Sequence, residues 1–167
     1  MQGRREEAAE WLVRAAERYR ESLEGAPPGS WGRPIGAMKA RLLAGDSGVE
    51  DDAGLALRMA LDVPETTIGR YAVCLALLVL GRDGEVLPLA LSLRGRDDFP
   101  PDVADALWAL AGADAAAYAD ASGRVLVSFE TRDEYLEDMP VADTVAVLEI
   151  LAEARGIAAG LRSPLLP

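Results

Sequence analysis

The sequence predicts an all-α fold, in which antiparallel helical hairpins stack in a tetratricopeptide-like bundle. Three observations predict it. A short Ala/Leu-rich phrase occurs at residues 40–46, 76–83 and 106–114, and each copy closes on a glycine with an aspartate one or two residues later. Prolines begin several of the intervening segments and glycines end them. Finally, the apolar residues are mostly Ala and Leu, which favour helices, and only 5% of the residues are aromatic.

The repeated phrase has the chemistry of one helix ending and another beginning. A glycine takes the left-handed conformation after a helix at little steric cost, and an aspartate accepts hydrogen bonds from the free N–H groups of the next helix. The three aspartates, Asp46, Asp83 and Asp114, lie 37 and 31 residues apart. A period in the thirties is typical of repeated helical hairpins.

The helices can be placed in order from these signals. Residues 6–23 form a first amphipathic helix, whose apolar stripe recurs every three or four residues. The stripe consists of Trp11, Leu12, Ala15, Ala16, Tyr19 and Leu23. Further helices are expected over residues 34–44, 70–80 and 115–129, with others starting near Glu50, Gly84 and Val103 and a last one between Pro140 and Gly156. We expect one domain over residues 1–167, with residues 1–25 as a helix packed on it.

An α+β fold with two β-hairpins is the alternative. Residues 71–93 contain an Asp-Gly pair between two apolar runs, which is a strong hairpin signal. Residues 116–131 contain a glycine followed by the alternating run Val125-Leu126-Val127-Ser128-Phe129. The Leu and Ala content of residues 71–80 favours helix there, and a glycine inside a helix costs about 1 kcal/mol relative to alanine. The helical interpretation is therefore preferred.

Charge and composition exclude several function classes. The net charge is −11, which disfavours nucleic acids and anionic membranes and is compatible with a basic protein partner. The chain has no histidine and a single cysteine, Cys74, so catalytic triads and nearly all zinc sites are excluded. No apolar signal segment follows Met1, which predicts a cytoplasmic location. We expect no catalytic residue, no metal site and no cofactor.

An acidic cluster near the C-terminus is the candidate partner-binding site. It comprises Glu130, Asp133, Glu134, Tyr135, Glu137 and Asp138. On a helix, Glu130, Glu134 and Asp138 would share one face because they are four residues apart. Such a face could meet a basic patch on another protein, with Trp31 and Tyr135 as aromatic anchors. A divalent-ion site and paired carboxylates for acid–base chemistry are the alternatives.

Residues 125–167 carry a family resemblance. After Ser128-Phe129-Glu130 come Arg132-Asp133-Glu134-Tyr135-Leu136-Glu137-Asp138, an Ala-rich helix with an Arg155-Gly156-Ile157 exit, and the tail Ser163-Pro164-Leu165-Leu166-Pro167. This stretch resembles the end of the all-helical immunity proteins of bacterial polymorphic toxin systems, particularly the family called immunity protein 49. The resemblance implies a bacterial, cytoplasmic inhibitor that binds a toxin and performs no catalysis.

The sequence thus predicts a non-enzymatic protein-binding module, and the resemblance implies an immunity protein that inhibits a cognate toxin through an acidic surface. Two other classes of function stay open with the α+β alternative. One is a small ligand-binding or dimeric chaperone-like protein, and the other is a carboxylate-dependent enzyme. A homodimer is compatible with each of them.

Overall fold

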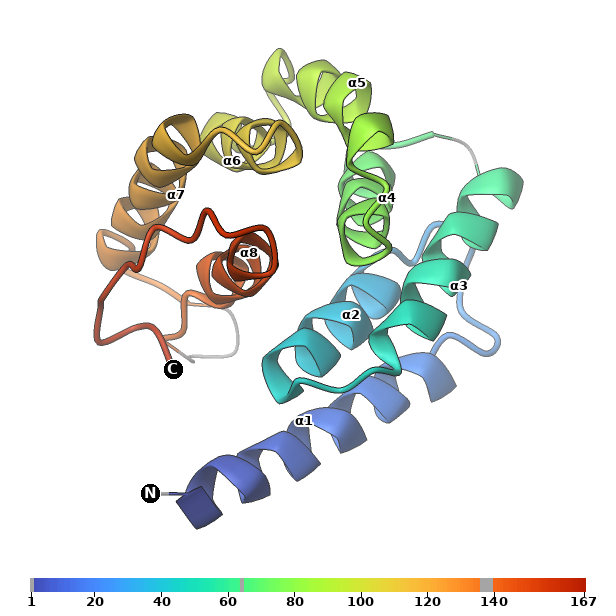
Figure 1. Cartoon of the computed structure of the whole chain (residues 1–167). Helices are drawn as coiled ribbons and strands as arrows, with labels where there is room; N and C mark the ends of the chain where they lie inside the picture. Colours follow the sequence, from blue (N-terminus) through green and yellow to red (C-terminus); the bar gives the residue numbers. More distant parts are fainter. Residues whose placement is uncertain (1, 64, 136–139) are drawn as a thin grey trace. The chain divides into compact units, whose positions relative to one another are not determined.

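A computed structural model describes residues 2–63, 65–135 and 140–167, and the fold is all-α, as predicted (Figure 1). Every regular element in the described residues is a helix. The helices are α1 (Gln2–Glu21), α2 (Gly32–Ala44), α3 (Val49–Asp62), α4 (Thr67–Val79), α5 (Asp83–Arg94), α6 (Pro101–Ala111), α7 (Ala115–Glu130) and α8 (Asp143–Glu153). Successive helices pack as hairpins, α1 on α2, α3 on α4 and α5 on α6.

Both hairpins of the α+β alternative are wrong. Residues 71–93 lie in α4 and α5, and residues 116–130 lie in α7. The Asp83-Gly84 pair begins α5 instead of forming a two-residue strand turn. Just before it, Gly81 has a φ of +67°, and the Arg82 N–H donates to the Leu77 carbonyl at 2.9 Å. This is the hydrogen bond of a helix end, so Gly81 closes α4 in the way the repeated phrase predicts.

The third copy of the phrase ends its helix differently. Gly45 and Gly81 both take the left-handed conformation. After α6, however, Gly112 has a φ of −81° and Ala113 takes the positive φ, +52°. The aspartate that follows behaves as expected, because the Asp114 side chain accepts the Ala117 N–H at 3.0 Å and caps α7. The third copy of the phrase therefore also separates two helices, but its left-handed residue lies one position later than the glycine.

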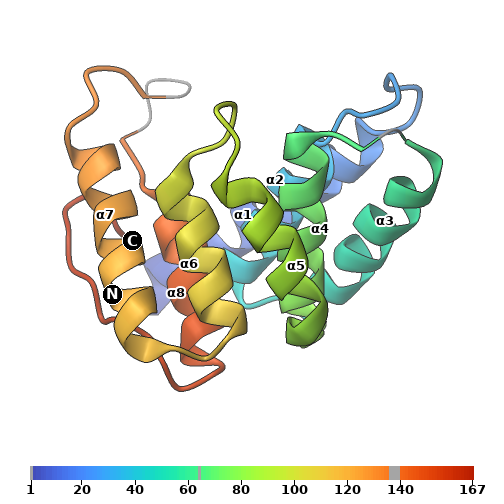
Figure 2. The same cartoon turned by 90° about the horizontal axis from the view of Figure 1, so that it is seen from above.

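The chain divides into two compact units, residues 1–82 and residues 83–167. In unit 1, α2 packs against α1, α3 and α4. In unit 2, α6 packs against α5, α7 and α8, and Figure 2 shows α5, α6 and α7 side by side. The expectation that residues 1–167 form a single domain stays a prediction.

The first helix, α1, uses only part of its predicted apolar stripe. Leu12 and Ala16 pack against α2, and the ring of Tyr19 lies so close to Gly36 that a side chain there would collide with it. Trp11, however, is 61% exposed, and the guanidinium of Arg14 lies 5.0 Å from the centre of its ring. The expectation that Trp11 packs inward is wrong, because α2 covers a narrower face of α1 than the apolar stripe offers.

A buried ion cluster joins the first three helices of unit 1. Asp52 of α3 has no exposed surface, and its Oδ2 accepts a hydrogen bond from Arg41 Nε of α2 at 2.8 Å. Its Oδ1 lies 3.3 Å from Arg20 Nε of α1. Arg41 also donates to Asp46 at 2.7 Å. Burial raises the pKa of Asp52, and the two guanidinium groups oppose that rise.

Cys74 of α4 is fully buried, and burial raises the pKa of its thiol to about 12. The thiolate is the reactive species, so at pH 8 its fraction should be roughly a thousandfold below that of an unfolded cysteine. We expect native protein to react with a thiol-specific disulfide reagent only as fast as it unfolds. Protein unfolded in guanidinium should instead react at once with one equivalent of the reagent per chain. Rapid reaction of native protein would contradict the burial of this thiol.

Unit 2 is built around aliphatic side chains and one tyrosine. Its fully buried large residues are Val86, Leu93, Leu107, Leu110, Tyr118, Val125, Val145, Val147 and Leu148. An ion pair joins residues that are far apart in the sequence of unit 2. Arg155, just after α8, donates to Asp83 at the start of α5, with distances of 3.0 and 2.5 Å. Arg155 also donates to the Leu151 carbonyl at 2.8 Å, which caps the end of α8.

Candidate protein-binding surface

The predicted acidic cluster begins where α7 ends. The helix stops at Glu130, and residues 131–135 are not helical. Glu130 and Glu134 therefore do not share a helix face, and that expectation is wrong. The helix expected over residues 115–129 thus ends within one residue of its predicted end, and the acidic cluster follows it instead of continuing it. Glu137 and Asp138 lie outside the described residues.

The described part of the cluster folds against the last turn of α7. Tyr135 is half-buried, and its hydroxyl donates to the Phe129 carbonyl at 2.8 Å. The guanidinium of Arg132 lies 3.9 Å from the centre of the Phe129 ring. Glu130 is exposed and accepts a hydrogen bond from the Ser163 hydroxyl at 2.7 Å. Asp133 and Glu134 are exposed. The cluster thus presents carboxylates on a turn instead of along a helix.

The second predicted anchor is not on the surface. Trp31 is 3% exposed, and its ring lies against the first turn of α4 at Gly69. Its indole N–H has no hydrogen-bond partner within the described residues. Trp31 therefore belongs to the core of unit 1 and is unable to act as an anchor for a partner without unfolding that unit. Tyr135 is left as the aromatic residue of the cluster.

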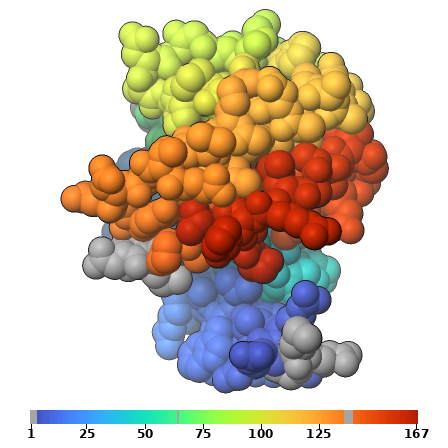
Figure 3. All heavy atoms as spheres, turned by 90° about the vertical axis from the view of Figure 1, so that its left-hand side faces the viewer, coloured from blue at the N-terminus to red at the C-terminus, as the bar shows by residue number. Residues whose placement is uncertain are grey.

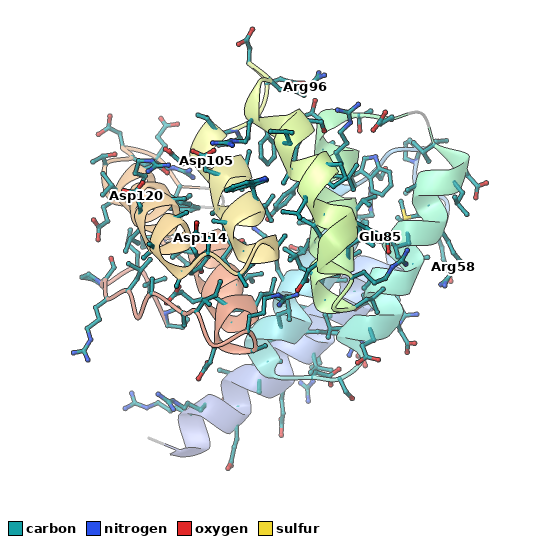
Figure 4. The ribbon with its side chains drawn as sticks, turned by 45° about the horizontal axis from the view of Figure 1, so that its top comes forward. Arg58, Glu85, Arg96, Asp105, Asp114 and Asp120 are labelled. Carbon is teal, nitrogen blue, oxygen red and sulfur yellow. The ribbon has the colours of Figure 1, made fainter. Side chains whose placement is uncertain are left out.

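A second group of carboxylates lies on α6 and α7, and the sequence analysis missed it. Asp102 and Asp105 of α6 lie 2.6 and 3.0 Å from the guanidinium of Arg124, and Asp120 of α7 also pairs with it. The hydrogen bond that Arg124 donates to Asp102 is the main cause of the raised pKa of Arg124. Figure 4 shows Asp105 and Asp120 on these neighbouring helices. The spacing of Asp102 and Asp105 could have indicated a shared face, but their partner is 22 residues away from Asp102.

Helix α7 connects the two groups, because Asp120 lies in its first half and Glu130 is its last residue. We define the acidic surface as Asp102, Asp105, Asp120, Glu130, Asp133 and Glu134. From Asp120 to Glu130 the helix rises about 15 Å. Between them Val127 is 55% exposed, as one apolar side chain among charged ones. The arrangement offers an apolar contact with carboxylates on both sides of it.

The charge of the chain is concentrated in unit 2. Residues 1–82 contain 11 basic and 12 acidic residues, a net charge of −1. Residues 83–167 contain 6 basic and 16 acidic residues, a net charge of −10. Four of the six arginines, at positions 94, 96, 124 and 155, already pair with carboxylates inside the unit. The remaining carboxylates give unit 2 a negative field that attracts cations over long range.

Within the described residues, no three carboxylate or thiol side chains converge as they would around a metal ion. None of the described helices combines the length and the apolar character needed to cross a membrane. Comparison of the chain with protein-family models, with curated proteins and with solved structures gives no match.

Proposed function

We propose that the protein is a non-enzymatic binding module that captures a basic protein on the acidic surface of unit 2. The observation that carries the proposal is the division of charge, −1 in residues 1–82 against −10 in residues 83–167. A charge that served solubility alone would have no reason to gather in one unit. Opposite potentials accelerate encounter between partners, and an apolar side chain within the field supplies contact after encounter.

A cationic protein is the partner that complements the acidic surface. Binding would inhibit that protein by covering its basic surface. The resemblance of residues 125–167 to bacterial immunity proteins supports a toxin as that partner and the cytoplasm as the location. Nucleic acid is disfavoured, because phosphates carry the same sign of charge as unit 2. Self-association stays a prediction, and light scattering of the purified chain measures it directly.

The test compares two charge-reversal variants on the full chain. In one, Asp133→Lys and Glu134→Lys reverse two of the six charges of the acidic surface. In the matched control, Glu6→Lys and Glu7→Lys reverse two exposed carboxylates of α1 in unit 1. Each tagged protein is used to capture partners from a lysate of the native host at low salt, followed by elution in a salt gradient.

We expect the wild type and the control to retain one basic protein in equal amounts, released by moderate salt. The acidic-surface variant should bind it at least about tenfold more weakly, mainly through slower association. The association and dissociation rate constants are then measured with the purified partner. Equal capture by both variants, or retention that does not respond to salt, would refute the proposed function.

A further inference from the structure

A stripe of exposed residues runs along α1 on the side away from α2. Figure 1 shows α2, α3 and α4 on one side of α1, and Figure 3 shows the blue atoms of α1 at the surface of the molecule. Ala16 is buried against α2, and Trp11 and Arg18 lie about 140° and 160° around the helix from it. We define the outer stripe as the exposed residues Arg4, Glu7, Trp11, Arg14, Arg18 and Glu21.

The six residues of the outer stripe follow the heptad spacing of a coiled coil. They are separated by three, four, three, four and three residues, which is the spacing of successive a and d positions. They therefore lie along one line of the helix over about 25 Å. In an antiparallel pair of such helices, each a residue of one helix lies opposite a d residue of the other. This spacing fixes which residues two copies of α1 bring together.

The outer stripe is complementary to a second copy of itself in the antiparallel orientation. Its opposing pairs are Arg4 with Glu21, Glu7 with Arg18, and Trp11 with Arg14. A two-fold axis repeats each pair, so opposite charges meet in every layer that contains two charged residues. A parallel pair would instead place Glu7 against Glu7 and Arg18 against Arg18, and like charges repel. The order of charges along α1 therefore favours one orientation of a second copy.

Trp11 provides the apolar contact at the centre of the outer stripe. Its side chain is 61% exposed, and the guanidinium of Arg14 in the same chain lies 5.0 Å from the centre of its ring. In the antiparallel pair, Arg14 of the second copy meets the same ring, and a cation–π contact strengthens when water is removed from it. Trp and Arg are also among the residues that contribute most to binding energy at protein interfaces.

The charge of α1 allows two copies of the helix to approach each other. It contains five arginines and five glutamates, and residues 1–82 as a whole have a net charge of −1. Two exposed residues beside the stripe, Glu10 and Glu17, oppose the contact, because they face each other across the antiparallel pair. The complementary layers must overcome this repulsion, which limits the affinity.

We propose that the outer stripe is a homodimer interface, on which a second copy of this chain binds with its α1 antiparallel. The interface is isologous, because the same surface is used by both copies. Most of its layers are polar, and polar residues at a and d positions specify register and orientation at a cost in stability. The dimer is therefore weak, with a dissociation constant of the order of 100 μM. The proposal concerns unit 1 and does not depend on the proposed function.

The experiment exchanges charges within one kind of layer on the full chain. Glu7→Arg and Arg18→Glu each place like charges opposite one another, twice in a symmetric dimer. An equimolar mixture of these two variants restores opposite charges, because one chain then carries two cations at these positions and the other two anions. Arg5→Glu makes the same change of charge at an exposed position outside the outer stripe and is the control. Sedimentation velocity over a concentration series measures each dissociation constant.

We expect the wild type and the Arg5→Glu chain to dimerise alike. Glu7→Arg and Arg18→Glu alone should each weaken the dimer at least about tenfold, and their mixture should dimerise as the wild type does. Trp11→Ala should also weaken it about tenfold. The proposal is overturned by a wild type that stays monomeric at about 1 mM, by a dimer that survives all three substitutions, or by a mixture as weak as its components.

A further variant should strengthen the dimer, which a folding defect is unable to imitate. Glu17→Lys places a cation opposite Glu10 of the second copy, where two carboxylates repel each other in the wild type. We expect about fivefold tighter dimerisation at low salt, and less at high salt. Unchanged or weaker dimerisation would overturn the antiparallel register. A monomeric wild type that sediments with vesicles of anionic lipid would assign the outer stripe to a membrane and would also overturn the proposal.

The proposed function and the homodimer can fail separately. The Glu6→Lys, Glu7→Lys chain places a cation opposite Arg18 of the second copy, so it should be monomeric. Because its acidic surface in unit 2 is intact, it should still capture the basic protein. A monomeric chain that captures the protein supports both proposals, and a dimeric one overturns the homodimer interface alone.

Discussion

Replacing Asp52 with alanine should destabilise the protein by about 3 kcal/mol, because removing one partner of a buried pair strands the other charge. Asp52 is fully buried between Arg41 and Arg20, which come from two other helices. Without it, the buried guanidinium of Arg41 is left with a pair to Asp46, at 2.7 Å, which does not replace the lost carboxylate. Urea unfolding followed by circular dichroism gives the change in the free energy of unfolding.

Asp51→Ala is the matched control for this prediction. Asp51 precedes Asp52 in the first turn of α3 and is exposed, so its removal should change the free energy of unfolding by no more than about 0.5 kcal/mol. A double variant, Arg41→Met with Asp52→Ala, should recover part of the loss, because no buried charge is then left unpaired. Equal effects of Asp51→Ala and Asp52→Ala would show that the ion cluster does not hold the three helices together.

Replacing Gly69 with alanine should destabilise unit 1 by about 2 kcal/mol through overpacking. A Cβ at this position of α4 would lie 2.9 Å from the ring of Trp31, which is buried and has no free space to move into. The better helix propensity of alanine offsets this loss by less than 1 kcal/mol. Urea unfolding followed by circular dichroism measures the loss, because Trp fluorescence would add the signals of Trp11 and Trp108 to that of Trp31.

The reference for that variant is Gly54→Ala in α3 of the same unit. There a Cβ would meet only the end of the exposed Arg58 side chain, at 3.3 Å, and Figure 4 labels this arginine on α3. We expect a gain of about 0.5 kcal/mol, because alanine replaces a helical glycine and the arginine can move aside. A Gly69→Ala protein as stable as the Gly54→Ala protein would mean that Trp31 does not pack on α4 as described.

Sequence reasoning predicted what depends on neighbouring residues. The helix of residues 70–80 follows from its Leu and Ala content, and the caps at Gly81 and Asp114 follow from local backbone chemistry. It failed where distant segments decide the outcome. Three consecutive acidic residues begin α3, and Asp52 is the one that turns inward, because Arg41 and Arg20 lie on that side.

In the candidate site, too, local features were predictable and contacts with distant segments were not. Exposure of Asp133 and Glu134 is the default for carboxylates, whereas the hydrogen bond from Ser163 to Glu130 joins residues 33 positions apart and has no local signal. The N–H groups of Ala159, Gly160 and Leu161 donate to Glu149 of α8, and nothing in the local sequence of that segment indicates this partner. Trp11 and Trp31 were equally apolar in sequence, and only the packing of α2 and α4 separates them.

The uneven charge has a consequence for the order in which the molecule comes apart. Repulsion among the carboxylates of residues 83–167 is screened by dissolved ions over about 10 Å at 0.1 M salt and over about 30 Å at 0.01 M. Dilute buffer therefore weakens the C-terminal half and leaves the nearly neutral N-terminal half almost unaffected. Lowering the ionic strength should therefore reduce the protection of residues 83–167 from hydrogen exchange more than that of residues 1–82.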